Sequence, residues 1–322
     1  MSNRMEKKSL RVEYGKYLVE LGRKYPQIIA LEADLKESTQ SIQFQQAFPE
    51  RYIEVGVAEQ NMIGIAAGLA LAGKMPITHS FACFTSMRAC EQVRTTVAYP
   101  RLNVKLLVSH GGISAGTAGT THHSIEDIAI MRAIPNMTVL VPGDATEVRQ
   151  VLDAAILHDG PVYIRLSAIE VEDVYGARDR FAIGKATLLR EGDDMTLVTT
   201  GIMMFEGIKA SDMLLKDYGI RARVLQMASV KPFDRESIAK AAEETRYIVT
   251  VEEHNIIGGL GSAVSEVAAE TGNAKVKRIG VNDRFSGVGT ASCLMRQEGL
   301  TEENIVAAVL KLLQIDHHPH RS

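Results

Sequence analysis

The fold of this chain is decided by the stretch RYIEVGVAEQN (residues 51–61), which continues as MIGIAAGLA (residues 62–70). The β-branched, apolar first part predicts a buried strand that ends at Ala58. The second part carries almost no side-chain bulk and predicts a helix. Glu59 lies at the junction, where burying a carboxylate is costly unless another group takes up its proton or its charge. Taken alone, Glu59 is expected to complement the helix dipole.

The composition is that of a soluble globular protein. The chain has 322 residues, 46% hydrophobic and 23% charged, enough for two domains that each bury a core. Its formal charge of −3 argues against a nucleic-acid or anionic-membrane surface. Cys83, Cys90 and Cys293 form no CxxC pair and indicate neither a disulfide framework nor a zinc site. The N-terminus lacks an apolar signal segment and no apolar run could span a membrane, so we expect a cytoplasmic protein.

Strand-like and helix-like segments alternate along the whole chain. Strands are expected at residues 28–34, 104–108, 138–142, 161–166, 196–199, 222–226, 247–252 and 276–279. Helices are expected at residues 145–157, 206–218, 235–244 and 262–271. This βαβ rhythm predicts an α/β fold with two mainly parallel sheets, each covered by helices on both faces.

A polar segment at residues 170–180 divides the chain. We expect a first domain at residues 1–175, a linker at 176–188 and a second domain at 189–315. Residues 316–322 contain three histidines and a proline. Because a proline and a chain end preorganise nothing, we expect a solvated tail there and no metal site.

Further motifs follow the Glu59 stretch in a fixed order. They are SFACF (80–84), SHGG (109–112), HSIED (123–127), VEEH (251–254), GGLG (258–261) and DRF (283–285). In this order and spacing they resemble the pyrimidine-binding half and the C-terminal domain of transketolase, a thiamine-diphosphate enzyme. The resemblance extends from about Ser9 to about Leu313.

The resemblance assigns roles to five residues. Thiamine diphosphate becomes reactive through an imino tautomer of its aminopyrimidine ring, which a carboxylic acid at the ring nitrogen N1′ favours. Glu59 matches this acid, and it is expected to act in catalysis as well as in cofactor binding. Phe81 matches the residue that stacks on the aminopyrimidine ring, and Phe84 matches one that lines the same pocket. His110 matches a substrate-binding histidine, and His122 a residue close to cofactor and donor that we expect to bind substrate and to take part in catalysis.

Three neighbouring features are ambiguous. Arg88 either supports the turn after Phe84 or makes a plain surface ion pair. His123 has no counterpart in the resemblance and is expected to face outward. The glycines of residues 258–261 resemble half of a dinucleotide fingerprint, but the spacing ends in Val264, so a tight turn at a helix N-terminus is the better interpretation.

The metal and diphosphate site is missing from the chain. Transketolases bind Mg²⁺ through a Gly-Asp-Gly motif followed by an Asn, and this sequence has no Gly-Asp-Gly. The resemblance therefore implies a split enzyme, in which an N-terminal subunit holds the divalent metal and the two chains assemble as α2β2. The alternatives are a silent regulatory subunit, half of a 1-deoxyxylulose-5-phosphate synthase, or the β subunit of a 2-oxoacid dehydrogenase. Retention of Glu59 and Phe81 favours an active transketolase.

Two positions depart from the family and bear on the substrate. In many transketolases an Asp forms a hydrogen bond with a hydroxyl group of the sugar donor, and here Ala118 replaces it. Many also have an Arg that binds the sugar phosphate, and here Ala168 replaces it. A neighbouring residue such as Arg165, or the partner chain, could compensate for this loss. Together the two alanines predict an unusual ketose donor, for example a branched one such as apulose 4-phosphate or a sulfonated one.

Overall fold

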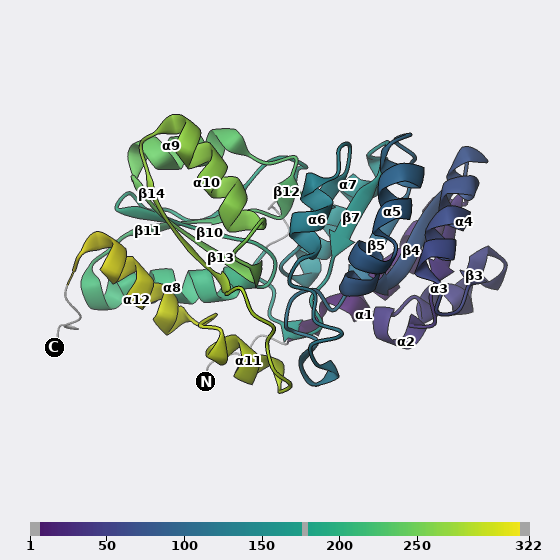
Figure 1. The fold of residues 1–322 in the computed structure, drawn as a ribbon, viewed down its shortest axis with the longest axis horizontal. Coiled ribbons are helices and arrows are strands. Elements are labelled where there is room, and N and C mark those ends of the chain that lie inside the picture. Colours follow the sequence, from purple (N-terminus) through teal and green to yellow (C-terminus); the bar gives the residue numbers. More distant parts are fainter. Residues whose placement is uncertain (1–6, 176–179, 316–322) are drawn as a thin grey trace.

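Two parallel-dominated sheets organise the chain, and the computed structural model describes residues 7–175 and 180–315 (Figure 1). The first sheet has the strand order β12-β6-β7-β5-β4-β2-β3. All its neighbouring strands are parallel except β12, which pairs antiparallel with β6. Its strands are β2 (Ile28–Glu32), β3 (Tyr52–Glu54), β4 (Met75–Phe81), β5 (Lys105–Ser109), β6 (Thr138–Leu140), β7 (Val162–Arg165) and β12 (Ser229–Lys231).

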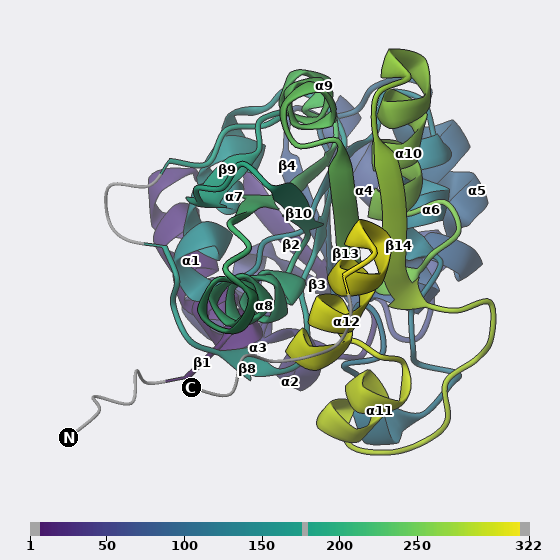
Figure 2. The same cartoon turned by 90° about the vertical axis from the view of Figure 1, so that its left-hand side faces the viewer.

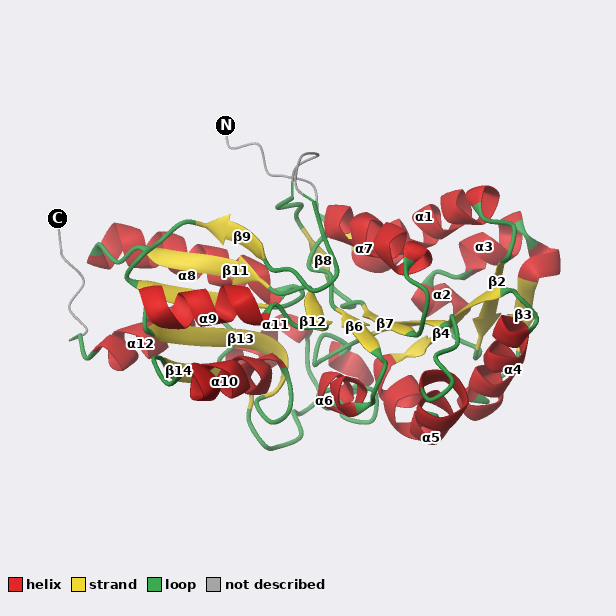
Figure 3. Ribbon diagram, turned by 90° about the horizontal axis from the view of Figure 1, so that it is seen from above, coloured by secondary structure: helices red, strands yellow, loops and turns green. Residues whose placement is uncertain are grey.

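Helices cover both faces of this sheet (Figure 3). One face packs against α1 (Leu10–Lys24), α3 (Ile42–Ala47) and α7 (Ala145–Leu157). The opposite face packs against α4 (Glu59–Leu71), α6 (Asp127–Ala133) and the segment from η2 (Phe84–Arg88) through α5 (Cys90–Gln92) to η3 (Val93–Ala98). Short elements at α2 (Lys36–Thr39), η1 (Pro49–Arg51) and η4 (Gly116–Ala118) complete this part.

The second sheet has the order β14-β13-β10-β11-β9, and only β9 runs antiparallel to its neighbour. Its strands are β9 (Thr187–Arg190), β10 (Met195–Thr199), β11 (Ala222–Gln226), β13 (Tyr247–Asn255) and β14 (Lys275–Val281). One face carries α8 (Met203–Tyr218) and α12 (Glu302–Leu313), and the other carries α9 (Arg235–Glu244) and α10 (Leu260–Thr271) (Figures 1 and 2). Helix α11 (Ala291–Gln297) lies near η4 of the first part.

Two short strand pairings were not predicted from the sequence. Strand β12 belongs to the second half of the chain but forms an edge of the first sheet. A small ladder joins β1 (Lys8–Ser9) to β8 (Glu170–Val171), so the polar segment expected at residues 170–180 begins as a strand. The predicted tail at residues 316–322 lies outside the described residues.

The α/β architecture with two mainly parallel sheets is confirmed, and the predicted helices at residues 145–157 and 235–244 have the predicted bounds. The predicted buried strand ending at Ala58 is wrong. Strand β3 ends at Glu54 and pairs only with β2, at the edge of the sheet, and Val57 is 69% exposed. An edge strand has one unpaired side, which explains why this apolar run is not fully covered. Within the described residues, no helix is long and apolar enough to cross a membrane.

Candidate active site

The predicted site residues gather at the carboxyl ends of β4 and β5, where ligands bind in open parallel sheets. Phe81 is the last residue of β4 and pairs in register with Ser109, the last residue of β5. His110 follows with a left-handed backbone at φ +59°. This sharp turn brings its imidazole ring over Phe81, with 4.0 Å between ring centroids.

Four aromatic rings form one cluster at this edge. Phe81 and Phe84 stack with their centroids 5.8 Å apart and their planes 15° apart. His122 meets both rings edge-on, at 6.0 Å from Phe81 and 5.4 Å from Phe84. The cluster thus contains four of the five predicted site residues, which come from the end of β4, the start of η2 and the loops at His110 and His122.

Glu59, the fifth, is the first residue of α4 and is 1% exposed. Its Oε2 accepts a hydrogen bond from Nη1 of Arg88 at 2.6 Å, and its Oε1 accepts a longer one from Ser80 Oγ at 3.3 Å. The guanidinium group of Arg88 also lies over the ring of Phe84, 4.4 Å from its centroid. Arg88 therefore packs on the turn, as one of its two expected roles requires, and its ion pair is made with a buried carboxylate and is not a plain surface pair. Through Arg88, Glu59 connects to the aromatic cluster.

His110, in the loop that follows β5, is neutral at physiological pH. Burial lowers the pKa of His110 to about 3, and the nearby charges of Arg11 and His122 contribute to that shift. Its Nδ1 lies 2.8 Å from Ser109 Oγ. A neutral imidazole has one donor and one acceptor nitrogen, so His110 can exchange hydrogen bonds with a substrate hydroxyl at neutral pH.

His123 does not face outward, contrary to the prediction. It is 5% exposed, and its Nε2 lies 3.1 Å from the carbonyl oxygen of Gly116. The loop after η4 folds back on itself, which turns the second histidine of the pair into the protein. Burial lowers the pKa of His123.

The predicted compensation by Arg165 is also wrong. Its side chain is 4% exposed, and its Nε donates to Asp127 Oδ2 at 2.8 Å, so it is committed to the protein interior. The cation beside Ala168 is instead Arg11, which donates to the carbonyl oxygens of Ala168 at 3.2 Å and Ser38 at 2.7 Å. Its Nε is buried and has no hydrogen-bond partner within the described residues. Sequence reasoning missed Arg11 because the contact with Ala168 crosses 157 residues.

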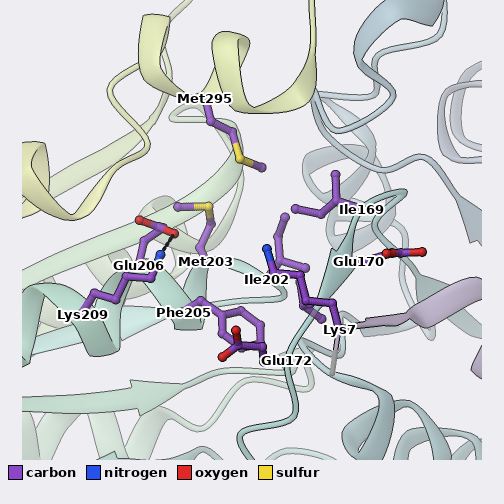
Figure 4. A pocket seen from close by; sticks show the side chains of 11 residues that line it. Lys7, Ile169, Glu170, Glu172, Ile202, Met203, Phe205, Glu206, Lys209 and Met295 are labelled. Atoms are coloured by element: carbon purple, nitrogen blue, oxygen red, sulfur yellow. Dashed lines mark hydrogen bonds and ion pairs between the residues drawn. The ribbon is translucent and has the colours of Figure 1, made fainter. Parts of the chain in front are cut away.

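A separate cavity of about 170 Å³ lies between the two sheets and is not part of this site. Figure 4 shows that apolar side chains, including Ile169, Phe205 and Met295, and charged side chains both line it. The rim charges Glu206 and Lys209 pair with each other at 2.9 Å. No predicted site residue lines this cavity.

Glu59 and the aromatic cluster fit the aminopyrimidine end of thiamine diphosphate. They offer a buried carboxyl group, a stacked aromatic wall and neutral imidazole, which together suit a flat heterocycle with a basic ring nitrogen. The described residues contain no group of three or more His, Cys, Asp or Glu that could hold a metal ion.

Comparison with known proteins defines the family. A model of the transketolase pyrimidine binding domain matches residues 6–172, and a model of the transketolase C-terminal domain matches residues 184–305. The chain belongs to the transketolase family.

Its relatives include subunits of split enzymes. The 6-deoxy-6-sulfo-D-fructose transketolase subunit SqwH of Clostridium sp. (strain MSTE9) is 46% identical, over 95% of this chain and 94% of the relative. An apulose-4-phosphate transketolase subunit of Phocaeicola vulgatus is 38% identical, over 94% of this chain and 97% of the relative. A solved split-gene transketolase in an inactive β4 tetramer is 46% identical with a TM-score of 0.88, over 95% of this chain and 99% of that chain.

The 1-deoxyxylulose-5-phosphate synthases are more distant. That of Desulfotalea psychrophila is 36% identical over 95% of this chain, which spans 48% of the synthase. The chain therefore matches nearly the full length of the transketolase subunits and about half of the synthase.

Proposed function

We propose that this chain is the pyrimidine-binding subunit of a two-component, thiamine-diphosphate-dependent transketolase. The enzyme transfers a two-carbon ketol unit from a ketose donor to an aldose phosphate acceptor. One observation carries this proposal: a buried acid, Glu59, is joined through Arg88 to the Phe81 cluster in a chain whose relatives are transketolase subunits.

When bound, the cofactor would supply a nucleophilic carbon for the transfer. Glu59 holds a proton at the aminopyrimidine nitrogen N1′. Its Oε1 is the oxygen left for this role, because Arg88 occupies Oε2 and the bond from Ser80 to Oε1 is long. Phe81 stacks on the aminopyrimidine ring and Phe84 lines the pocket beside it. His110 and His122 bind the hydroxyl groups of the sugar, and His122 moves a proton during the transfer.

The metal and the diphosphate belong to the partner subunit in this proposal. An N-terminal subunit with a Gly-Asp-Gly motif would hold Mg²⁺ or a similar cation, and the two chains would assemble as α2β2. The outer surface formed by α4 and the η2–η3 segment is suited to contact with the partner subunit. It carries exposed apolar residues, and a Cβ atom added at Gly64 or Gly68 would meet nothing within 4 Å, so another backbone could approach closely. The apolar residues are Val57 (69% exposed), Leu71 (75%), Met87 (49%) and Tyr99 (83%).

We place the enzyme in the cytoplasm. Its three cysteines, Cys83, Cys90 and Cys293, are free thiols, as a reducing compartment would keep them.

The donor is proposed to be an unusual ketose. Ala118 and Ala168 remove one hydrogen-bond acceptor and one cation of the family pattern. Arg11 remains beside Ala168 as a cation for an anionic group, either a phosphate or a sulfonate. Relatives named for a sulfonated ketose and for the branched ketose phosphate apulose 4-phosphate support this choice.

The test is to assay the chain with its partner subunit, thiamine diphosphate and Mg²⁺. Ketol transfer is measured for xylulose 5-phosphate, apulose 4-phosphate and 6-deoxy-6-sulfofructose, with pyruvate condensation measured in parallel. The proposal predicts ketol transfer with the highest kcat/KM for one of the unusual donors. Turnover of pyruvate alone would assign the chain to the synthase class. A preference for xylulose 5-phosphate, at roughly 10⁴ M⁻¹s⁻¹ or above, would show that other groups compensate for the two alanines.

A further inference from the structure

The end of β13, in the second sheet, forms hydrogen bonds with the segments that follow the two site histidines. The backbone N–H of Asn255 donates to the carbonyl oxygen of Ile125 at 2.9 Å, three residues after His122. Two positions earlier, the side chain of Glu253 enters the first domain, where its Oε1 accepts a hydrogen bond from the backbone N–H of Ser114. Glu253 is 3% exposed, and its Oε2 is buried without a partner in the part of the chain that the structure describes.

The two glycines after His110 lie in contact with charged side chains. A Cβ atom at Gly112 would overlap the carboxyl group of Glu253, and one at Gly111 would overlap the guanidinium group of Arg165. Gly112 also has φ +73°, which favours glycine. The loop therefore rests directly on one side chain from each domain.

Arg165 joins these parts together. Besides its bond to Asp127, its Nη2 donates to the carbonyl oxygens of Glu253 at 2.9 Å and Ser124 at 3.2 Å. Gly112 and Ser124 exchange two backbone hydrogen bonds of 2.8 and 2.9 Å. The loop of His110 and the loop of His122 are thus hydrogen-bonded to each other, and both contact the end of β13.

We propose that Glu253, a residue of the C-terminal domain, is a positioning residue of the transketolase site, because its carboxyl group holds the loop that places His110. The inference rests on the proposed function and gives the C-terminal domain a part in substrate binding. Glu253 acts through Ser114 and the two glycines. Glu59 and Phe81 do not contact Glu253 through a hydrogen bond; Glu59 is held by Arg88 and Ser80, and the backbone of Phe81 by its pairing with Ser109.

Glu252 provides a matched control. It is adjacent and equally buried, but its carboxylate accepts from the backbone N–H groups of Leu260 and Gly261, inside the second domain, at 2.7 and 2.8 Å. Loss of either carboxyl group removes buried hydrogen bonds, but only Glu253 contacts the loop of His110.

The experiment compares Glu253→Ala, Glu253→Gln and Glu252→Ala in the complex with the partner subunit, thiamine diphosphate and Mg²⁺. Glu253→Ala should raise the KM for the ketose donor on the order of 10- to 100-fold, the effect of a misplaced binding group, and leave cofactor affinity unchanged. Glu253→Gln should restore the KM, because its amide oxygen can accept from Ser114. Glu252→Ala should lower the melting temperature without raising the KM.

A second readout does not depend on activity. Hydrogen exchange of the peptide covering residues 110–116 should be faster in Glu253→Ala than in Glu252→Ala. Equal exchange and equal KM values in these two variants would overturn the proposal, as would a Gln variant as impaired as the Ala variant. If Glu253→Ala does not fold, Glu253→Asp takes its place. It retains the acid but is one methylene too short, and an unchanged KM in that variant would also overturn the proposal. A wild-type complex without ketol transfer would refute the proposed function, whereas the exchange comparison would still decide the role of Glu253.

Discussion

Arg88 donates a hydrogen bond of 2.6 Å to Glu59, and the two side chains have opposite environments: Glu59 is almost fully buried and Arg88 is 44% exposed. The pair places a charge-assisted bond beside the ring of Phe84, and the arginine side chain is partly exposed to solvent. An isolated buried carboxylate would be costly, and Arg88 offsets that cost while leaving Oε1 available. The geometry explains how a carboxylate can be buried at this site.

Glu59→Gln is predicted to fold and assemble but to lose most ketol transfer. Glutamine cannot hold or release the proton at N1′, and loss of a positioned acid–base group costs on the order of 10²–10⁴-fold in rate. The rate is measured with the partner present, and the melting temperature controls for folding. A variant with near wild-type transfer would refute the role of Glu59.

Phe81→Ala is predicted to weaken cofactor binding by several-fold, because a stacking contact contributes about 1 kcal/mol. Phe84→Ala is the matched variant from the same stacked pair and should have a smaller effect. Calorimetric titration of the complex with thiamine diphosphate measures both affinities, and Phe81→Leu controls for lost volume. An unchanged affinity in Phe81→Ala would transfer the stacking role to Phe84.

Arg11→Met is predicted to raise the KM for donors that carry a phosphate or sulfonate by about tenfold, as expected for loss of one charge-assisted hydrogen bond. Arg165→Met is the contrasting variant. It leaves Asp127 as an unpaired buried charge and should destabilise folding by about 3–5 kcal/mol. Steady-state kinetics and thermal unfolding separate the two effects. Equal KM values for anionic and neutral ketoses in wild-type protein would rule out an anion-binding role for Arg11.

The sequence predicted most of the fold and the central cluster because those features are local or ordered along the chain. The helix at residues 145–157 begins after Asp144, whose side chain caps it by accepting from the backbone N–H of Glu147 at 2.7 Å, a signal that spans four residues. Glu59, Phe81, Phe84, His110 and His122 were found through motifs, and the structure brings them together.

The failures have a physical cause, since they depend on contacts that no pattern in the sequence specifies. The strand after Arg51 lies at the edge of the sheet, and an apolar run in the sequence carries no information about that position. His123 turns inward through a loop that closes on Gly116. Arg11 and Glu253 reach the site from segments 157 and 139 residues away from their contacts, so no spacing in the sequence indicates them.

Glu253→Gln is predicted to become more stable relative to wild type as the pH rises. Burial raises the pKa of Glu253 from 4.5 to about 7, and Arg165 and the N–H of Ser114 only partly oppose the shift. The folded state therefore retains the proton that the unfolded state releases. This proton uptake stabilises the folded wild-type protein. The stabilisation is fully present below pH 4.5 and is lost as the pH rises through about 7. Glutamine does not titrate.

The check is chemical denaturation of both proteins between pH 5 and 8. The difference in unfolding free energy should move in favour of Glu253→Gln by up to about 3 kcal/mol across that range. A constant difference would show that Glu253 does not take up a proton on folding.

The central claim is that two chains share one cofactor, and calorimetric titration with thiamine diphosphate in the presence of Mg²⁺ tests it most directly. The titration is carried out on this chain alone, on the partner subunit alone and on their equimolar mixture. The account predicts tight binding and ketol transfer only in the mixture, because this chain supplies the aminopyrimidine contacts around Glu59 and Phe81 and the partner supplies the diphosphate and metal contacts. Micromolar binding of the cofactor to this chain alone would contradict it.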